Sequence, residues 1–302
     1  MGMRRKIATA TAVGTVATVG TTAGFLFGET VLARRLIGVT DARPPSPDGL
    51  YGDDQPGETI RAVVLGDSAA VGYGMLTALT TPPALLGYGL AQRLASPVQM
   101  HSVAVVGAES SDLAEQVDRA LPLAADVAVI VIGANDVTHL KSARDAAYDL
   151  SLAVTRLVEA GTAVVVGTCP DLGTVRPIKE PLRSVARLSS RRLARKQTVA
   201  AVQAGARTVS LGGLLGPIFI QHHELMFGDD RFHPSASGYA SLVTALLSSV
   251  ADAVHERRSE PVEDDAPSQV MPVDEAADLA THRDGTEVRG AGRWAGVLRR
   301  RR

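Results

Sequence analysis

Arg61-Ala-Val-Val-Leu-Gly-Asp-Ser68 is the stretch that decides the fold, because it joins a short apolar run to a glycine and a polar turn. An apolar run of this length, without alternating polar residues, is typical of a strand buried on both faces. Similar runs recur farther along the chain, at residues 98–106, 126–132, 162–167 and 206–211. The sequence therefore predicts five buried strands.

Amphipathic stretches of helical length separate these runs. They cover residues 82–95, 111–120, 143–160 and 182–204, and a fifth stretch covers residues 236–255. Regular alternation of strands and helices predicts a parallel sheet with helices on both faces, joined by right-handed crossovers. The predicted fold class is α/β.

Four segments are expected along the chain. Residues 1–36 are expected to form a signal-anchor or a signal peptide, because residues 7–27 carry no charge and are long enough to cross a bilayer. The uncleaved anchor is favoured, which places the following domain outside the cytoplasm; cleavage would make the protein secreted. Residues 37–59 are expected to form a linker, and residues 60–256 are expected to form the folded domain. Residues 257–302 are expected to form a disordered, acidic tail that ends in arginines.

The composition excludes several classes of protein. Lys and Arg (31) almost balance Asp and Glu (32), so the chain lacks the basic excess of a nucleic-acid-binding protein. Its single cysteine, Cys169, excludes an internal disulfide and a zinc site built from several thiolates. A lone cysteine of this kind is expected to be a small buried core residue.

Polar residues and glycines follow the first three predicted strands, where the ligands of an open α/β sheet gather. Ser68 follows the first strand, and its hydroxyl suits a nucleophile, although a serine there also caps helices. Gly107 follows the second strand and offers a backbone N–H, or simply turns the chain. Asn135 follows the third strand, and its amide suits an oxyanion donor, or an Asx-turn.

A fourth cluster, Asp-Asp-Arg-Phe-His-Pro at residues 229–234, precedes the last helix. Asp230 stands three residues before His233, so it can hold one imidazole nitrogen while the other faces a nucleophile. His222 and His223 have no acid at this spacing. A nucleophile, an oriented base and oxyanion donors together favour acyl transfer.

The Gly-Asp-Ser, Gly107, Gly-Ala-Asn-Asp and Asp-Arg-Phe-His-Pro segments resemble the four sequence blocks of the SGNH (GDSL-like) hydrolases, of the exported or membrane-anchored bacterial type. The resemblance covers residues 61–255. It implies a flavodoxin-like three-layer α/β/α fold with five parallel strands in the order 2-1-3-4-5. It also implies a catalytic triad of Ser68, His233 and Asp230, an oxyanion hole of Ser68 N–H, Gly107 N–H and the Asn135 side chain, and neither metal nor cofactor.

The chain departs from the family pattern at two places, which bear on substrate preference. Ala69 replaces the leucine that often follows the serine, and residues 103–106 lack an asparagine that often precedes the second-block glycine. The nucleophile elbow of α/β-hydrolases, Gly-x-Ser-x-Gly, is disfavoured because its last position is Ala70.

The expected function is that of a serine esterase, which forms an acyl-enzyme from a small-molecule, lipid or glycan acyl ester. The alternatives are a cell-envelope deacetylase, acyltransferase or lysophospholipase with the same chemistry, and a non-catalytic scaffold. The apolar segment 212–228 is expected to be a long loop. Our hypothesis is that part of it forms a wall of an acyl-chain pocket, which substitution of Phe227 would test. The alternative is that its side chains pack in the core beneath the loop.

Overall fold

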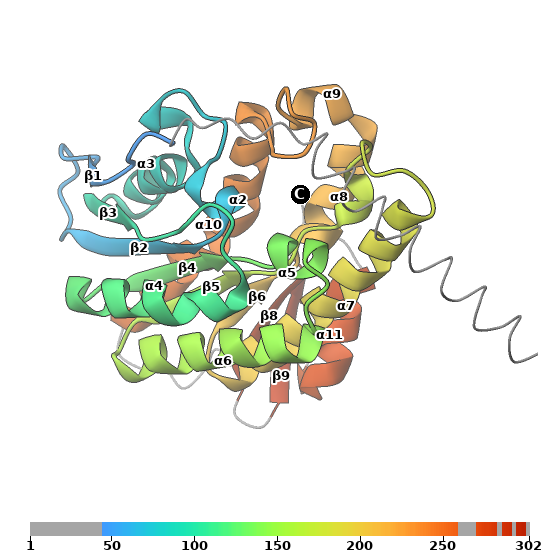
Figure 1. The fold of residues 1–302 in the computed structure, drawn as a ribbon. Helices are drawn as coiled ribbons and strands as arrows, with labels where there is room; N and C mark the ends of the chain where they lie inside the picture. The colour runs from blue at the N-terminus through green and yellow to red at the C-terminus, as the bar shows by residue number, and fades with distance from the viewer. Residues whose placement is uncertain (1–43, 259–269, 283–285, 292–293, 300–302) are drawn as a thin grey trace, which may run out of the picture.

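Five parallel strands form the centre of the sheet in the computed structural model, which describes residues 44–258, 270–282, 286–291 and 294–299 (Figure 1). In spatial order they are β3 (Val98–Ser102), β2 (Ile60–Gly66), β4 (Val127–Val131), β5 (Ala163–Gly167) and β6 (Arg207–Val209). All four neighbouring pairs are parallel. The predicted strand order 2-1-3-4-5 is therefore confirmed.

Helices cover both faces of this sheet, as the doubly buried strands require. On one face, Val63 and Leu65 of β2 pack in a core with α4 (Leu113–Ala120) and α6 (Ala143–Glu159). On the other face, Val64 packs in a core with α3 (Pro82–Leu94), α8 (Leu211–Gln221) and α10 (Ala236–Arg258). The long helix α7 (Leu182–Gln203) contributes residues to both cores.

Short elements connect these layers. The short helices are α2 (Ser68–Val71), α5 (Ala134–Thr138) and α9 (His223–Met226). The single 3₁₀ turns are η1 (Ala78–Thr80), η2 (Ser110–Asp112), η3 (Leu121–Leu123) and η4 (Leu172–Thr174). Helices α2 and α5 follow closely on β2 and β4, so they carry residues at the carboxyl edge of the sheet.

The sheet is longer than predicted at both ends. β1 (Gly49–Tyr51), inside the predicted linker, pairs antiparallel with β3. At the other edge, β8 (Thr286–Ala291) pairs antiparallel with β6, followed by β9 (Trp294–Arg299) and β7 (Val270–Met271). The described part of the chain therefore forms a mixed sheet of nine strands.

The prediction of a disordered tail over 257–302 is wrong for the residues described there. Helix α11 (Val273–His282) packs against α7, and its Ala276 and Ala280 are buried with Val288 of β8. Arg207 of β6 forms an ion pair with Glu287, and both side chains are buried. Small apolar side chains are buried in this polar segment, and a long-range ion pair ties it to β6. Its composition does not predict this core.

Segment 212–228 is helical rather than a long loop. Ser210 accepts a hydrogen bond from the Gly213 N–H at the start of α8, and the helix contains Pro217. Glycine and proline lower helix propensity, which is why the sequence favours a loop here. Packing of Leu211, Leu215 and Phe219 into the core overrides that propensity.

Within the described residues, only α10 is long and apolar enough to cross a membrane. More than half of its most apolar window is buried inside the protein, where it packs against α3 and β5. It is placed as a core helix. The predicted anchor at residues 7–27 lies outside the described residues.

Candidate active site

Ser68 lies at the sharp turn between β2 and α2. Gly66 has φ +134°, and a Cβ there would lie 1.9 Å from the Val131 carbonyl oxygen, so the turn requires glycine. The Asp67 carboxylate caps α2 by accepting a hydrogen bond from the Ala69 N–H at 2.9 Å. Ser68 is therefore fixed as the first residue of α2, with 7% of its surface exposed.

His233 lies within hydrogen-bond distance of both Ser68 and Asp230. Its Nε2 is 3.0 Å from the Ser68 Oγ, and its Nδ1 is 2.6 Å from Asp230 Oδ2. Asp230 Oδ1 accepts hydrogen bonds from the Phe232 and His233 N–H groups, both at 2.9 Å. Burial raises the pKa of Asp230, but these hydrogen bonds outweigh it and lower the pKa below its usual value. The acid is thus held as an anion beside the imidazole.

The other two histidines of this region lie elsewhere. His223 is buried, with its ring centroid 4.6 Å from that of Phe227. Burial lowers its pKa, as do the charges of Arg176 and Arg231. His222 is exposed at the end of α8. The spacing of acid and histidine in the sequence therefore selects the histidine that reaches Ser68.

Gly107 and Asn135 follow β3 and β4, the two neighbours of β2. Gly107 has φ +84°, with open space where a Cβ would lie. Its N–H has no acceptor among the described residues. Asn135 donates one amide hydrogen to the Ala108 carbonyl at 2.9 Å, which ties α5 to the Gly107 loop and leaves the second amide hydrogen for a ligand. The predicted donors therefore lie at the ends of three adjacent strands.

Two buried residues missed from the sequence also join the Gly107 loop to α5. The Asp136 carboxylate accepts hydrogen bonds from the Ser110 backbone N–H at 3.1 Å and from its hydroxyl at 2.9 Å. Burial raises the pKa of Asp136 despite these bonds. The two residues are 26 positions apart, so no local pattern indicates the contact. The Asp that follows Asn135 is the only available signal.

The side chains of two buried glutamines form hydrogen bonds to the backbone at the ends of the strands. Gln116 accepts from the Gly66 N–H at 2.7 Å and donates to the Gly66 carbonyl at 2.9 Å. Gln197 accepts from the Cys169 N–H at 2.7 Å and donates to the Ile132 carbonyl at 3.0 Å. Each replaces ladder partners where the chain turns away from the sheet. Cys169 is buried, as its sequence predicts.

An apolar pocket with a volume of about 70 Å³ lies beside Ser68 and His233, which both line it. Its walls come from α2 and α5, from the loop after β5, from α8 and α10, and from the turn that carries His233. Leu215, Phe219 and Phe227 of the apolar segment 212–228 line it. Leu214, Ile218, Leu225 and Met226 do not.

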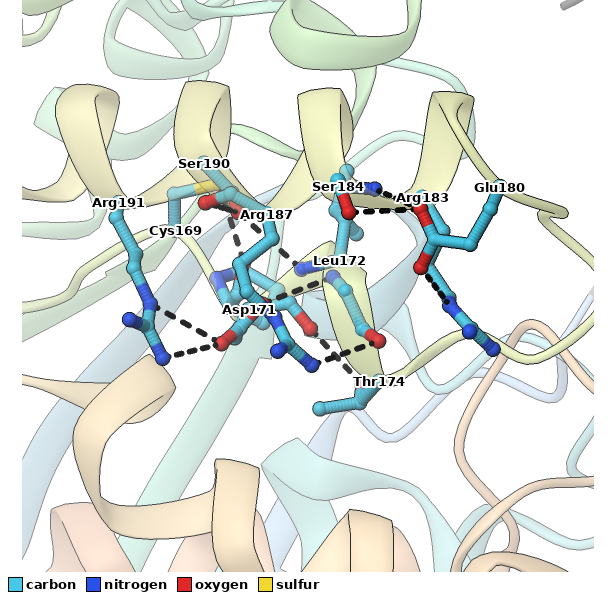
Figure 2. Close-up of polar contacts among 12 residues, drawn as sticks. Cys169, Asp171, Leu172, Thr174, Glu180, Arg183, Ser184, Arg187, Ser190 and Arg191 are labelled. Atoms are coloured by element: carbon cyan, nitrogen blue, oxygen red, sulfur yellow. Dashed lines mark hydrogen bonds and ion pairs between the residues drawn. The ribbon is translucent and has the colours of Figure 1, made fainter.

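The wall formed by η4 is held in place from α7 (Figure 2). Asp171, which is buried and lines the pocket, accepts from Arg191 at 3.1 Å and lies 3.6 Å from the Arg187 guanidinium. Ser190 accepts from the Leu172 N–H at 3.3 Å. These contacts fix the shape of one side of the pocket.

Residues 64–241 match the model of the GDSL-like lipase/acylhydrolase family and thus more than half of the 302-residue chain. The chain belongs to this family. The GDSL-like esterase Rv1075c of Mycobacterium tuberculosis is 39% identical over 277 residues, which cover 87% of this chain and 88% of that protein. The protein is accordingly an enzyme, a carboxylic ester hydrolase of the GDSL type, and the resemblance of its four sequence blocks to the GDSL-like family is confirmed.

Solved structures at low sequence identity share the fold. LAE5, an alpha/beta hydrolase enzyme from the metagenome of Lake Arreo, has a TM-score of 0.53 at 19% identity, over 66% of this chain and 97% of that one. A member of the lipolytic protein G-D-S-L family from Veillonella parvula has a TM-score of 0.51 at 14% identity, over 63% of this chain and 97% of that one. Both support the α/β fold class of this GDSL-type hydrolase.

Proposed function

We propose that the enzyme hydrolyses acyl esters through a Ser68–His233–Asp230 triad and an acyl-enzyme. The observation that carries the proposal is the 3.0 Å distance between Ser68 Oγ and His233 Nε2, with Asp230 on the opposite ring nitrogen. This is the arrangement that an oriented general base requires.

In the first step, His233 Nε2 takes the Ser68 hydroxyl proton while Oγ attacks the ester carbonyl carbon. The bond to the alcohol oxygen then breaks, and the alcohol leaves with the proton from His233. In the second step, water attacks the acyl-enzyme and gives a proton to His233, the acid is released, and Ser68 recovers its proton. Asp230 stays ionised and stabilises the imidazolium in both steps.

The charge on the carbonyl oxygen is met by the N–H groups of Ser68 and Gly107 and by the free amide hydrogen of Asn135. Removing one such donor costs about 3 kcal/mol of barrier in related chemistry. In this proposal, Asp136 and Ser110 are positioning residues, because their hydrogen bonds hold the Gly107 loop against α5.

The substrate that this site favours is an ester with an apolar acyl chain. The pocket beside Ser68 is lined mostly by carbon, including Leu215, Phe219 and Phe227, and such a wall gains free energy by taking a hydrocarbon chain from water. A lipid ester fits this lining better than the acetyl group of a sugar, which would leave most of the pocket wet.

The site of action proposed for the enzyme is outside the cytoplasm. The support is the uncharged segment 7–27, preceded by Arg4, Arg5 and Lys6. Fractionation of cells that produce the full chain, combined with protease treatment of intact cells, tests this placement. If the enzyme were recovered in the soluble cell fraction and were protected from protease added to intact cells, this placement would be refuted.

The test of the mechanism is hydrolysis of chromogenic acyl esters by Ser68→Ala. Loss of Ser68 removes the nucleophile but no core contact, so turnover is expected to fall by at least about 10³-fold with unchanged unfolding. Asn135→Ala should keep the nucleophile and lose about 100-fold in kcat. A Ser68→Ala variant with the wild-type rate would refute the triad.

A further inference from the structure

The first half of α7 and the loop before it form a strongly basic end of the molecule. Residues 176–196 contain eight Lys or Arg residues and a single acid, Glu180, although the full chain has 31 basic and 32 acidic residues. A quarter of all basic residues thus fall within 21 positions. We call residues 176–196, together with Ile220 and Leu225, the basic end.

Local acids neutralise only part of this charge. Asp171 pairs with both Arg187 and Arg191, as Figure 2 shows, and Glu180 pairs with Arg183. Asp278 of α11 pairs with Arg195. The other four cations have no acidic partner among the described residues; they are Arg176, Lys179, Arg192 and Lys196. A net positive charge therefore remains at this end.

Large apolar side chains are exposed among these cations. Leu188 has 72% of its surface exposed, and Val185, one turn earlier on α7, is exposed too. Arg192 is four residues after Leu188, so it lies on the same face of the helix. A helix face with both Arg and exposed Leu is the pattern of a segment that rests in the headgroup region of a bilayer.

The α8–α9 region continues this surface. Arg176 donates a hydrogen bond to the Ile220 carbonyl at 3.3 Å, which brings the loop before α7 against the end of α8. Ile220 and Leu225 are both exposed there. Near His223, the charges of Arg176 and Arg231 outnumber that of Glu224.

The basic end adjoins one wall of the apolar pocket. Val175 and Phe232 line the pocket, and Arg176 and Arg231 are their direct neighbours in the chain. Asp171 lines the pocket from the other side of η4 and is bound to α7. A flat partner resting on the basic end would therefore lie close to the pocket that Ser68 lines.

We propose that the basic end docks on the surface of a bilayer that contains anionic phospholipids. Its unpaired cations match the charge of the headgroups, and its exposed leucines and isoleucine match the acyl region beneath them. The proposal goes beyond the esterase chemistry. Its test does not depend on turnover, so its failure and that of the triad are distinguishable.

A dye that senses polarity, attached to Leu188→Cys in the full chain, tests the docking locally. The native Cys169 is buried, so labelling selects the new thiol. With vesicles of phosphatidylcholine plus phosphatidylglycerol, we expect a blue shift of emission that high salt reverses. Phosphatidylcholine vesicles alone are expected to give much less. The matched control is Leu152→Cys on α6, also exposed, which should give no shift.

Charge reversal at Arg192 and Lys196 together should weaken the apparent vesicle affinity at position 188 by about 30-fold or more, because each cation near such a surface contributes about fivefold. Reversal of Arg93 and Arg144, on α3 and α6, is the control and should leave the affinity unchanged. Hydrolysis of a soluble short-chain ester should be equal in all these variants. No shift at position 188, or equal shifts at 188 and 152, would overturn the proposal.

Discussion

Asp67 is expected to make the stability of the protein depend on pH, because its carboxyl group is buried. Its side chain is almost fully buried beneath the Ser68 turn. Burial, partly offset by the hydrogen bond from the Ala69 N–H and by the nearby His233, raises the pKa of Asp67 from 3.8 to about 6. Asp67→Asn keeps the shape of the cap and removes the titration.

The sign follows from proton linkage. Because the folded state binds this proton more tightly than the unfolded chain, the contribution of Asp67 to stability is greatest below pH 3.8 and is lost as the pH rises to 6. A difference of about 2.2 pKa units, at about 1.36 kcal/mol each, amounts to about 3 kcal/mol. About 2 kcal/mol of this loss falls between pH 4 and pH 7.

The assay is urea unfolding of the wild type and of Asp67→Asn at several pH values between 4 and 7. The free energy of unfolding of the variant, relative to the wild type, is expected to rise by about 2 kcal/mol over this range. Ala69→Gly is the matched control, since it alters the same turn but removes no polar group; its difference from the wild type should stay constant. A difference for Asp67→Asn that is constant, or that falls with pH, would show that the pKa of Asp67 is not raised in the folded protein.

Three further outcomes are expected. Asp230→Asn should lower kcat for a chromogenic ester by up to about 10⁴-fold, because His233 loses its anionic partner; a loss below tenfold would contradict this role. Arg207→Met removes the cation that pairs with buried Glu287, so urea unfolding should show a loss of about 3–5 kcal/mol, and an unchanged midpoint would argue against docking of the tail. Phe227→Ala should move the preferred acyl length toward longer chains in a kcat/KM series, whereas an unchanged profile would remove this residue from the pocket.

The central sheet could be predicted because its strands are buried on both faces. The run before Gly66 is apolar at every position but its first. Where stretches of helical length separate such runs, a strand buried on both faces is the structure that each run favours. The helix limits were also close; α6 begins at Ala143, as expected, because Ser142 caps it. Local signals were sufficient where the periodicity and the caps agreed.

The edges of the sheet could not be predicted, because their stability comes from distant partners. Glu287 is an acidic residue in a polar segment, and nothing near it in sequence indicates that Arg207, 80 residues earlier, pairs with it. Helix α8 was missed for the opposite reason. Its glycines and Pro217 argue locally for a loop, whereas its apolar side chains are held by the core.

The site residues could be predicted where the spacing in the chain sets the geometry. Asp230 and His233 are three residues apart, and one turn of backbone is enough to bring Oδ2 to Nδ1. The supporting contacts could not be predicted, since Asp136 with Ser110 and Gln116 with Gly66 join separate elements across the sheet. Only the folded chain brings those pairs together.

Reaction of the full chain with a fluorophosphonate ester, followed by peptide mass spectrometry, tests the triad most directly. We expect one covalent adduct, on Ser68, because among the described residues only this hydroxyl has a histidine base at 3.0 Å that is itself bound to a carboxylate. His233→Ala should react far more slowly, whereas the binding of a neutral ester in the pocket is preserved. An adduct on another residue, or equal labelling of the His233→Ala variant, would show that Ser68 and His233 do not act as nucleophile and base.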